Sequence, residues 1–228
     1  MMLISDKKNF PPRRIKSFAR CAGRMTPAQR LAVDTVLPQY LWSEQSVIDK
    51  PLILDIGFGM GHSLAWQAER YPQYHFLGVE VFLPGAARLA TLLKEKNLSN
   101  VHIVVGDVVL LLKERLPSHC LAGVQLFFPD PWTKKRHHKR RLMQADFLTL
   151  LLRHLQKGAF LHFASDWENY CQSVQDLFKS YTELSFTIPV HGVEVLERPS
   201  TRYENRGLVQ GHAIEDIVVW LPEQDSNL

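Results

Sequence analysis

The chain has few cysteines and no metal-binding pattern. Its 228 residues include three cysteines, Cys21, Cys120 and Cys171, which are far apart and form neither a CxxC nor a Cys/His zinc spacing. The ten histidines form no HExxH pattern. These absences argue against a disulfide framework and against a zinc centre, so we expect reduced thiols and no metal.

Long apolar runs are also missing. No stretch of about 18 uncharged apolar residues occurs, and the first residues, MMLISDKKNFPPRRIK, lack the apolar core of a signal peptide. The composition, 46% hydrophobic and 22% charged, is that of an ordinary globular protein. We therefore expect a cytoplasmic protein that contacts no membrane and has no obligate protein partner.

Acidic residues are absent from two segments. Residues 7–30 and 134–141 hold 14 of the 27 Lys and Arg residues and none of the 23 Asp and Glu residues, so the rest of the chain is net acidic. Such a distribution favours a polyanionic partner, because neutralising phosphates releases counterions. The alternative for these segments is a solvated charge run or a disordered tail. We divide the chain into residues 1–45, a basic arm with a short helix capped by Thr26, and a main domain, 46–228.

Short apolar runs alternate with helical patterns from residue 51 onward. The runs are nearly continuous in apolar residues, as strands buried on both faces are. They lie at residues 51–57, 75–81, 101–107, 121–128 and 158–166. The alternation predicts an α/β fold with a doubly wound, mostly parallel, Rossmann-like sheet. The late runs SFTIPV and AIEDIVVW are expected to complete one edge, with an antiparallel edge strand.

Acidic residues recur where the predicted strands end. They are Asp55, Glu80, Asp107, Asp130 and Asp166. Ligands of open α/β sheets bind at the carboxyl ends of the strands. We therefore expect these side chains on one ligand-binding rim.

A glycine-rich loop follows the first predicted strand. Gly57, Gly59 and Gly61 allow the tight turn and close backbone approach of a nucleotide-binding loop, although Gly59 and Gly61 could be ordinary turn glycines. His62 stands where the dinucleotide fingerprint needs a small residue, which argues against a dehydrogenase. No GK[ST] follows, so the loop is not a P-loop.

Two acidic residues suit an adenosine. Glu80 lies about 20 residues after the loop, where a carboxylate accepts hydrogen bonds from ribose hydroxyls. Asp107 is placed to accept from the adenine amine, or else caps the following helix. Asp166, the acidic residue after the last predicted parallel strand, need not bind a ligand. It stands beside Ser165 and Glu168, which have the spacing of a helix capping box. S-adenosylmethionine, which has adenine and ribose but no pyrophosphate, is the cofactor that fits.

Several motifs together resemble those of the bacterial tRNA (guanine-N7-)-methyltransferases. They are LDIGFGMG, FLGVE, VVGD, QLFFPDPWTKKRHHKRR, ASDW and RPSTRYENRG. FFPDPW followed by a basic run is specific to this family, whereas the glycine loop is shared with many methyltransferases. The resemblance extends from about residue 13 to residue 220. It implies the class I methyltransferase fold, S-adenosylmethionine as cofactor, and methyl transfer to a guanine N7 in the tRNA variable loop.

The resemblance also implies roles for single residues. The cofactor-binding set is Asp55, where the family often has Glu, with Gly57, Gly59, Gly61, Glu80, Asp107 and Asp130. The catalytic residue is Asp130. The substrate-binding set is Lys134, Asp166, Thr201, Arg202, Tyr203 and Glu204. The RNA-contacting set is Arg136, His137, His138, Lys139, Arg140 and Arg141.

Guanine N7 carries a lone pair and no proton, so its methylation needs no general base. Asp130 is therefore expected to act as a fixed anion that accepts from the base or stabilises its growing positive charge, with N7 held in line with the methyl group. Trp132 could stack on an extruded base or belong to the core. For Phe128 we favour the core, and Arg202 with Glu204 could be only a surface pair.

Two other functions stay open. A methyltransferase with a small molecule or protein as acceptor would explain the cofactor motifs but would leave the basic segments without a role. An RNA-binding module that has lost catalysis would bind tRNA with a steep salt dependence and would bind no cofactor.

Overall fold

Six strands form one sheet in the computed structural model, which describes residues 25–187 and 194–222. The strands are β1 (Leu52–Ile56), β2 (His75–Glu80), β3 (Val101–Val105), β4 (Leu121–Phe127), β5 (Leu155–Ser165) and β6 (Glu215–Trp220). Their order is β3-β2-β1-β4-β5-β6, and every neighbouring pair is parallel except β5 and β6. The predicted doubly wound sheet with an antiparallel edge strand is confirmed.

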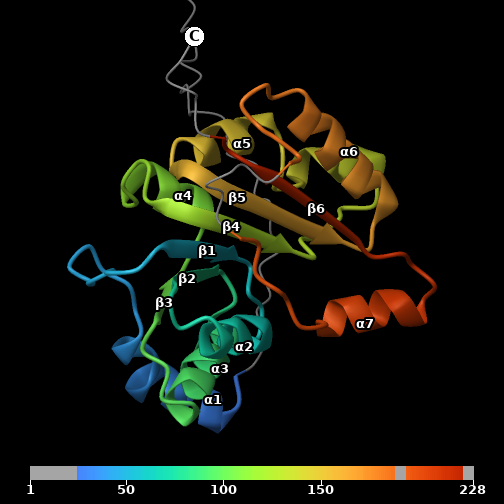
Figure 1. Ribbon diagram of the computed structural model, residues 1–228. Helices are drawn as coiled ribbons and strands as arrows, with labels where there is room; N and C mark the ends of the chain where they lie inside the picture. Colours follow the sequence, from blue (N-terminus) through green and yellow to red (C-terminus); the bar gives the residue numbers. More distant parts are fainter. Residues whose placement is uncertain (1–24, 188–193, 223–228) are drawn as a thin grey trace, which may run out of the picture.

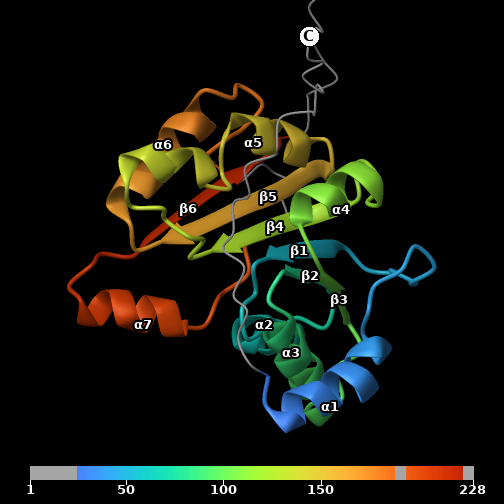
Figure 2. The same cartoon turned by 180° about the vertical axis from the view of Figure 1, so that it is seen from behind.

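Helices cover both faces of this sheet (Figures 1 and 2). One face carries α4 (Val108–Glu114), α5 (Ala145–Leu152) and α6 (Glu168–Lys179), and the other carries α2 (His62–Arg70) and α3 (Leu83–Glu95), with α1 (Pro27–Thr35) packed against α3. Leu54 and Val124 pack in the core of the first face, whereas Ile53 and Phe160 pack in the core of the second. The strands are thus buried on both sides, which explains their nearly unbroken apolar sequence.

The helix predicted near the N-terminus is present and begins with the predicted N-cap, Thr26. The Thr26 hydroxyl accepts from the Gln29 amide, the Gln29 side chain accepts from the Thr26 amide, and Pro27 follows the cap. This helix packs against α3, and after a 3-10 turn, η1 (Leu37–Gln39), Leu41 bridges to Ile103 of β3. The part of the N-terminal segment that the structure describes therefore contacts the main sheet, while residues 1–24 lie outside the described residues.

Two further elements lie near the carboxyl ends of the strands. They are a basic 3-10 helix, η2 (Lys135–Arg140), after β4, and α7 (Arg202–Val209), before β6. Figure 1 shows α7 on the side of the sheet toward which β4 and β5 point. The predicted run SFTIPV makes only an isolated bridge, between Ser185 and Trp220, and its last three residues lie outside the described ranges.

The described residues hold no membrane span and no metal cluster. No helix within residues 25–187 and 194–222 is long and apolar enough to cross a membrane. In the same ranges no three His, Cys, Asp or Glu side chains are grouped so as to hold a metal ion. Cys120 and Cys171 are free thiols, and Cys21 lies outside the described residues.

Candidate active site

The glycine-rich loop needs its glycines for their backbone conformation. Gly57, Gly59 and Gly61 have φ angles of 76°, 58° and 76°, in the left-handed region that glycine adopts without a steric penalty. A Cβ atom at Gly61 would lie 2.5 Å from the Cβ atom of Leu89. At Gly57 and Gly59, by contrast, a Cβ atom would meet nothing within 4 Å, so the loop faces open space. The loop can therefore approach a ligand with its backbone.

Glu80 connects this loop to the end of β2. One carboxylate oxygen accepts from the Gly59 amide at 2.8 Å, and the other accepts from the amides of Val81 and Phe82 at 2.7 and 2.9 Å. Burial raises the pKa of Glu80 and the negative charge of Asp130 adds to the increase, while the three backbone hydrogen bonds oppose it. A carboxylate has about four lone-pair sites, so these bonds do not exclude a further one from a ribose hydroxyl. The structure thus places Glu80 as predicted, next to the loop.

Asp107 caps α4, which was the alternative to an adenine contact. Its side chain accepts from the Val109 amide at 3.0 Å. The residue also stands two positions after the end of β3, the strand next to the one that carries Glu80. A carboxylate can accept several hydrogen bonds at once, so the capping role does not exclude a contact with a ligand.

Asp55 lies below the rim. Its side chain is 3% exposed, and burial together with the charge of Glu80 raises its pKa from 3.8 to about 7. Asp55 pairs in register with Gln125 of β4, and Gln125 pairs with His162 of β5. In-register neighbours of parallel strands point to the same face, so these three residues form a polar row inside the sheet. The mostly apolar sequences of the strands did not predict this row.

The polar row contains groups that lack protein partners. Among the described residues, the buried side-chain nitrogen and oxygen atoms without a hydrogen bond all belong to Ser63, Gln67, Gln125 and His162. Ser63 and Gln67 lie four residues apart on α2, which covers the face that contains Ile53. Unpaired buried polar groups cost free energy. Two of these four residues, Gln125 and His162, belong to the polar row, so part of the row is buried at a cost in free energy.

We expect Asp55→Asn to stabilise the protein in a pH-dependent way. The native pKa of about 7 lies above the ordinary 3.8. Native Asp55 therefore keeps a proton that the unfolded chain loses as the pH rises from about 4 to about 7, and stability falls across that window. Asparagine has no such charge to bury. Its advantage in the free energy of unfolding should grow from about pH 5 to about pH 8, as measured by urea denaturation without cofactor.

The exposed residue Asp34 supplies the control for this measurement. Asp34→Asn removes a carboxylate from the surface of α1 and should give no comparable gain. A gain from Asp55→Asn that is the same at both pH values would contradict a neutral, protonated Asp55.

Asp130 stands in a turn that has unusual backbone angles at both ends. Phe128 and Trp132, which flank the P-D-P sequence, have φ angles of 49° and 46°, a conformation that is strained for aromatic residues. The Phe128 amide donates to the carbonyl of Ala164 at 2.8 Å, which ties the turn to β5. Asp130 is exposed, and its negative charge contributes to the raised pKa of Glu80. The structure therefore brings the predicted catalytic residue to the same rim as the predicted ribose ligand.

The two aromatic residues of this turn have cationic neighbours. The Arg140 guanidinium lies 4.8 Å from the centre of the Trp132 ring, and His137 meets that ring edge-on at 6.0 Å. The Arg198 guanidinium lies 5.4 Å from the Phe128 ring. Both rings are half-buried, so neither belongs to the fully buried core.

The basic segment that follows the turn divides into two kinds of residue. Arg141 is 6% exposed, although it was predicted to contact RNA. Its guanidinium donates to the carbonyls of Pro131 and Asn169 and to the side chains of Asn169 and Ser173, and it covers the Tyr170 ring. We therefore correct its role to a structural one. The exposed or half-buried members are Lys134, Lys135, Arg136, His137, His138, Lys139 and Arg140.

Asp166 directly follows β5 and packs against α7. Its Oδ2 atom lies 3.2 Å from Nδ1 of His212. A Cβ atom at Gly207 would lie only 2.8 Å from the same oxygen, so glycine is required for this close approach. The capping box that Ser165 and Glu168 could have formed is absent, because Trp167 caps α6 without a side-chain hydrogen bond.

The T-R-Y-E sequence forms the first turn of α7. Thr201 is the N-cap and accepts from the Glu204 amide at 3.0 Å, while the Glu204 carboxylate accepts from the Thr201 amide at 3.2 Å. This is a capping box, which the T-x-x-E spacing could have predicted. The side chains of Arg202 and Tyr203 lie outside the part of the chain that the structure describes. The cationic partner of Glu204 is Arg198, which the sequence had not singled out.

Comparisons with known proteins identify the family of this chain. The family model described as "Putative methyltransferase" matches residues 49–217. A tRNA (guanine-N(7)-)-methyltransferase from Nitrosococcus oceani is 40% identical and covers 92% of each chain. Proteins with the same name from Paraburkholderia xenovorans (41% identical; 90% of this chain and 83% of the relative) and Nitrosospira multiformis (39%; 92% and 96%) are similarly related.

Solved structures give a more distant match. An rRNA methylase from Streptococcus thermophilus aligns with a TM-score of 0.48 and 11% identity, over 88% of this chain and all of that one. The curated relatives, by contrast, match this chain at about 40% identity over nearly its whole length. On this ground the chain belongs to the family of the tRNA (guanine-N(7)-)-methyltransferases.

Proposed function

We propose that this protein transfers the methyl group of S-adenosylmethionine to N7 of a guanine in the variable loop of tRNA. The observation that carries the proposal is the position of Asp130. It is exposed on a conformationally constrained turn, close enough to raise the pKa of Glu80 on the cofactor side, and a basic 3-10 helix follows it directly. Because tRNA is the substrate, we place the enzyme in the cytoplasm.

The residues of the rim suit this cofactor. Open space above Gly57 and Gly59 lets the loop backbone approach a ligand, and the Glu80 carboxylate is already oriented by three amides. Glu80 would hold the ribose hydroxyls, and Asp107 the adenine amine. The bound cofactor supplies a methyl group on a positively charged sulfur. Asp55 is buried below the loop, so we propose no contact between it and the ligand.

Asp130 would orient the acceptor. N7 attacks with its lone pair and no proton leaves it, so the protein must align the base and stabilise the positive charge that develops on the purine. An exposed carboxylate on a constrained turn can accept from the N1–H and amine of guanine and place negative charge beside the ring. Trp132, half-buried on the same turn, would stack on the base.

The exposed basic residues after the turn would hold the RNA backbone. Their ammonium and guanidinium groups can neutralise phosphates near the guanine that Asp130 orients. Asp166 and the first turn of α7, which lie on the same rim, would also contact the nucleotide. The phosphate-contacting residues we propose are Lys134, Arg136, His137, His138, Lys139 and Arg140.

The direct test is the transfer of labelled methyl from S-adenosylmethionine to bulk tRNA, followed by nucleoside analysis. We expect label in 7-methylguanosine. Binding of tRNA without any transfer would support the catalytically silent module instead. Transfer to a protein or small molecule, with none to tRNA, would move the assignment to a different acceptor.

A further inference from the structure

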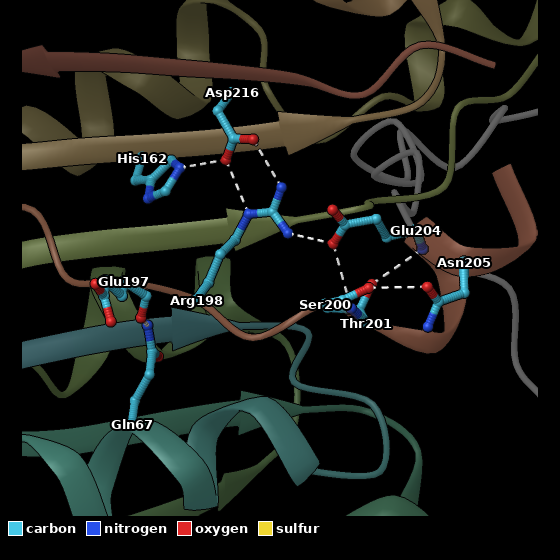
Figure 3. Close-up of polar contacts among 9 residues, drawn as sticks. All are labelled: Gln67, His162, Glu197, Arg198, Ser200, Thr201, Glu204, Asn205 and Asp216. Carbon is cyan, nitrogen blue, oxygen red and sulfur yellow. Dashed lines mark hydrogen bonds and ion pairs between the residues drawn. The ribbon is translucent and has the colours of Figure 1, made fainter. Parts of the chain in front are cut away.

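We propose that Arg198 is a positioning residue of the methyl transfer, which holds the first turn of α7 against the turn that carries Asp130. The inference rests on the proposed function and concerns a residue outside every predicted site. Arg198 lies in residues 194–201, which we name the crossing segment because they connect the α2 side of the rim with α7 (Figure 3). Its side chain is 9% exposed, so its charge needs partners within the protein.

The first partner of Arg198 belongs to the sheet. The guanidinium meets the Asp216 carboxylate with two parallel contacts, Nε to Oδ1 at 2.8 Å and Nη2 to Oδ2 at 2.7 Å. Asp216 also lies 2.6 Å from Nε2 of His162, a buried residue of β5. Burial opposes ionisation of Asp216, but Arg198 and His162 still hold its pKa well below the ordinary value. The guanidinium is therefore fixed to β5 and β6 by a carboxylate that stays charged.

The second partner belongs to α7. The remaining guanidinium nitrogen, Nη1, donates to Oε2 of Glu204 at 2.5 Å, and the same oxygen accepts from the Thr201 amide (Figure 3). Glu204 thus has two roles: it accepts from Arg198, which lies outside the helix, and it caps the first turn of its own helix. Its carboxylate is 16% exposed and occupied by these contacts. In the family resemblance Glu204 is a substrate residue, but this geometry indicates that it acts by fixing the turn that contains Arg202 and Tyr203.

The third contact reaches the catalytic turn. The guanidinium lies 5.5 Å from the Phe127 ring and 5.4 Å from the Phe128 ring, over the end of β4 just before Asp130. One flat cation therefore contacts the base of the Asp130 turn, the edge strand and α7. Because arginine presents its donors in a rigid fork, the three elements keep one relative position, which a lysine could not impose as well.

The rest of the crossing segment is held without Arg198. Gln67 donates to the Glu197 carbonyl at 2.9 Å, the Glu197 amide donates to the Tyr71 hydroxyl at 3.0 Å, and Leu196 is buried. Loss of the Arg198 side chain should therefore loosen the first turn of α7 without detaching the segment from α2. Arg70, which pairs with Glu197 at 2.9 Å on the exposed surface, provides a matched control.

The experiment compares Arg198→Met, Arg198→Lys, Glu204→Gln and the Arg198→Met/Glu204→Gln double variant with the parent and with Arg70→Gln. We measure kcat and KM for tRNA, the Kd for S-adenosylmethionine, and thermal unfolding. We expect Arg198→Met to raise the KM for tRNA at least about tenfold, with cofactor Kd within about twofold, since the cofactor loop is untouched. Arg198→Lys should recover part of the loss, and Arg70→Gln should match the parent.

The double variant decides whether Arg198 acts through Glu204. If it does, the double variant should be no worse than Arg198→Met, because the second change removes an interaction that is already lost. Losses that multiply, or a loss of cofactor binding by the folded Arg198→Lys variant, would overturn the proposal. A KM for tRNA that is the same in Arg198→Lys as in Arg70→Gln would also overturn it. The parent in the same assay tests the proposed function separately, since its failure to methylate tRNA would not depend on any variant.

Discussion

Replacing Asp130 with alanine should lower kcat for tRNA methylation about 100-fold or more, the usual cost of removing one preorganised electrostatic group. The Kd values for S-adenosylmethionine and tRNA should change only a few-fold, because the glycine loop, Glu80 and the basic segment remain in place. Asp130 is exposed and not part of the core, so the variant should fold. Single-turnover kinetics with saturating cofactor would separate the chemical step from binding.

Two further variants make the Asp130 result specific. Asp130→Asn keeps an acceptor oxygen at the turn but removes the charge, so its activity should lie between alanine and the parent if both orientation and charge contribute. Asp146→Ala removes an exposed carboxylate from the first turn of α5 and should leave turnover unchanged. Near-full activity of Asp130→Ala would end its assignment as the catalytic residue.

Arg141→Ala should destabilise the fold by about 2–3 kcal/mol, since the enclosed guanidinium makes several hydrogen bonds and a hydrogen bond to a charged group contributes about 1.5–3 kcal/mol. The guanidinium contacts the carbonyls of Pro131 and Asn169 and lies 4.6 Å from the centre of the Tyr170 ring. It therefore ties the segment after Asp130 to α6. Urea unfolding of the variant would measure the loss.

The neighbouring residue should behave in the opposite way. Arg140 is exposed and lies over Trp132, so Arg140→Ala should cost less than about 1 kcal/mol of stability. Its effect should appear in RNA binding, where the slope of log K against log salt should flatten by about 0.7 to 0.9 for one lost phosphate contact. An unchanged slope would show that Arg140 is only solvated, and an unchanged stability of Arg141→Ala would contradict its structural role.

The sequence by itself determined the fold class and most of the rim. Apolar runs of strand length alternate with helical patterns, and this periodicity follows from burial of the strands on both faces. Because parallel strands end at one edge, residues that follow different strands had to meet there, so the strand pattern alone places Glu80 and Asp130 on one rim. The conformations of Gly57, Gly59 and Gly61 were predictable as well, since only glycine adopts them freely.

Only the tertiary structure decided which charged side chains face solvent and which are enclosed. Arg140 and Arg141 are adjacent and chemically identical, but the direction of one short helix leaves the first exposed and places the second against α6. Arg198 lies in the crossing segment, Glu204 in α7 and Asp216 in β6. These elements come together because β4, β5 and β6 are neighbours in the sheet. Local patterns report whether a side chain is apolar, but the partner of a buried charge depends on strand order and register, which are set by contacts between distant parts of the chain.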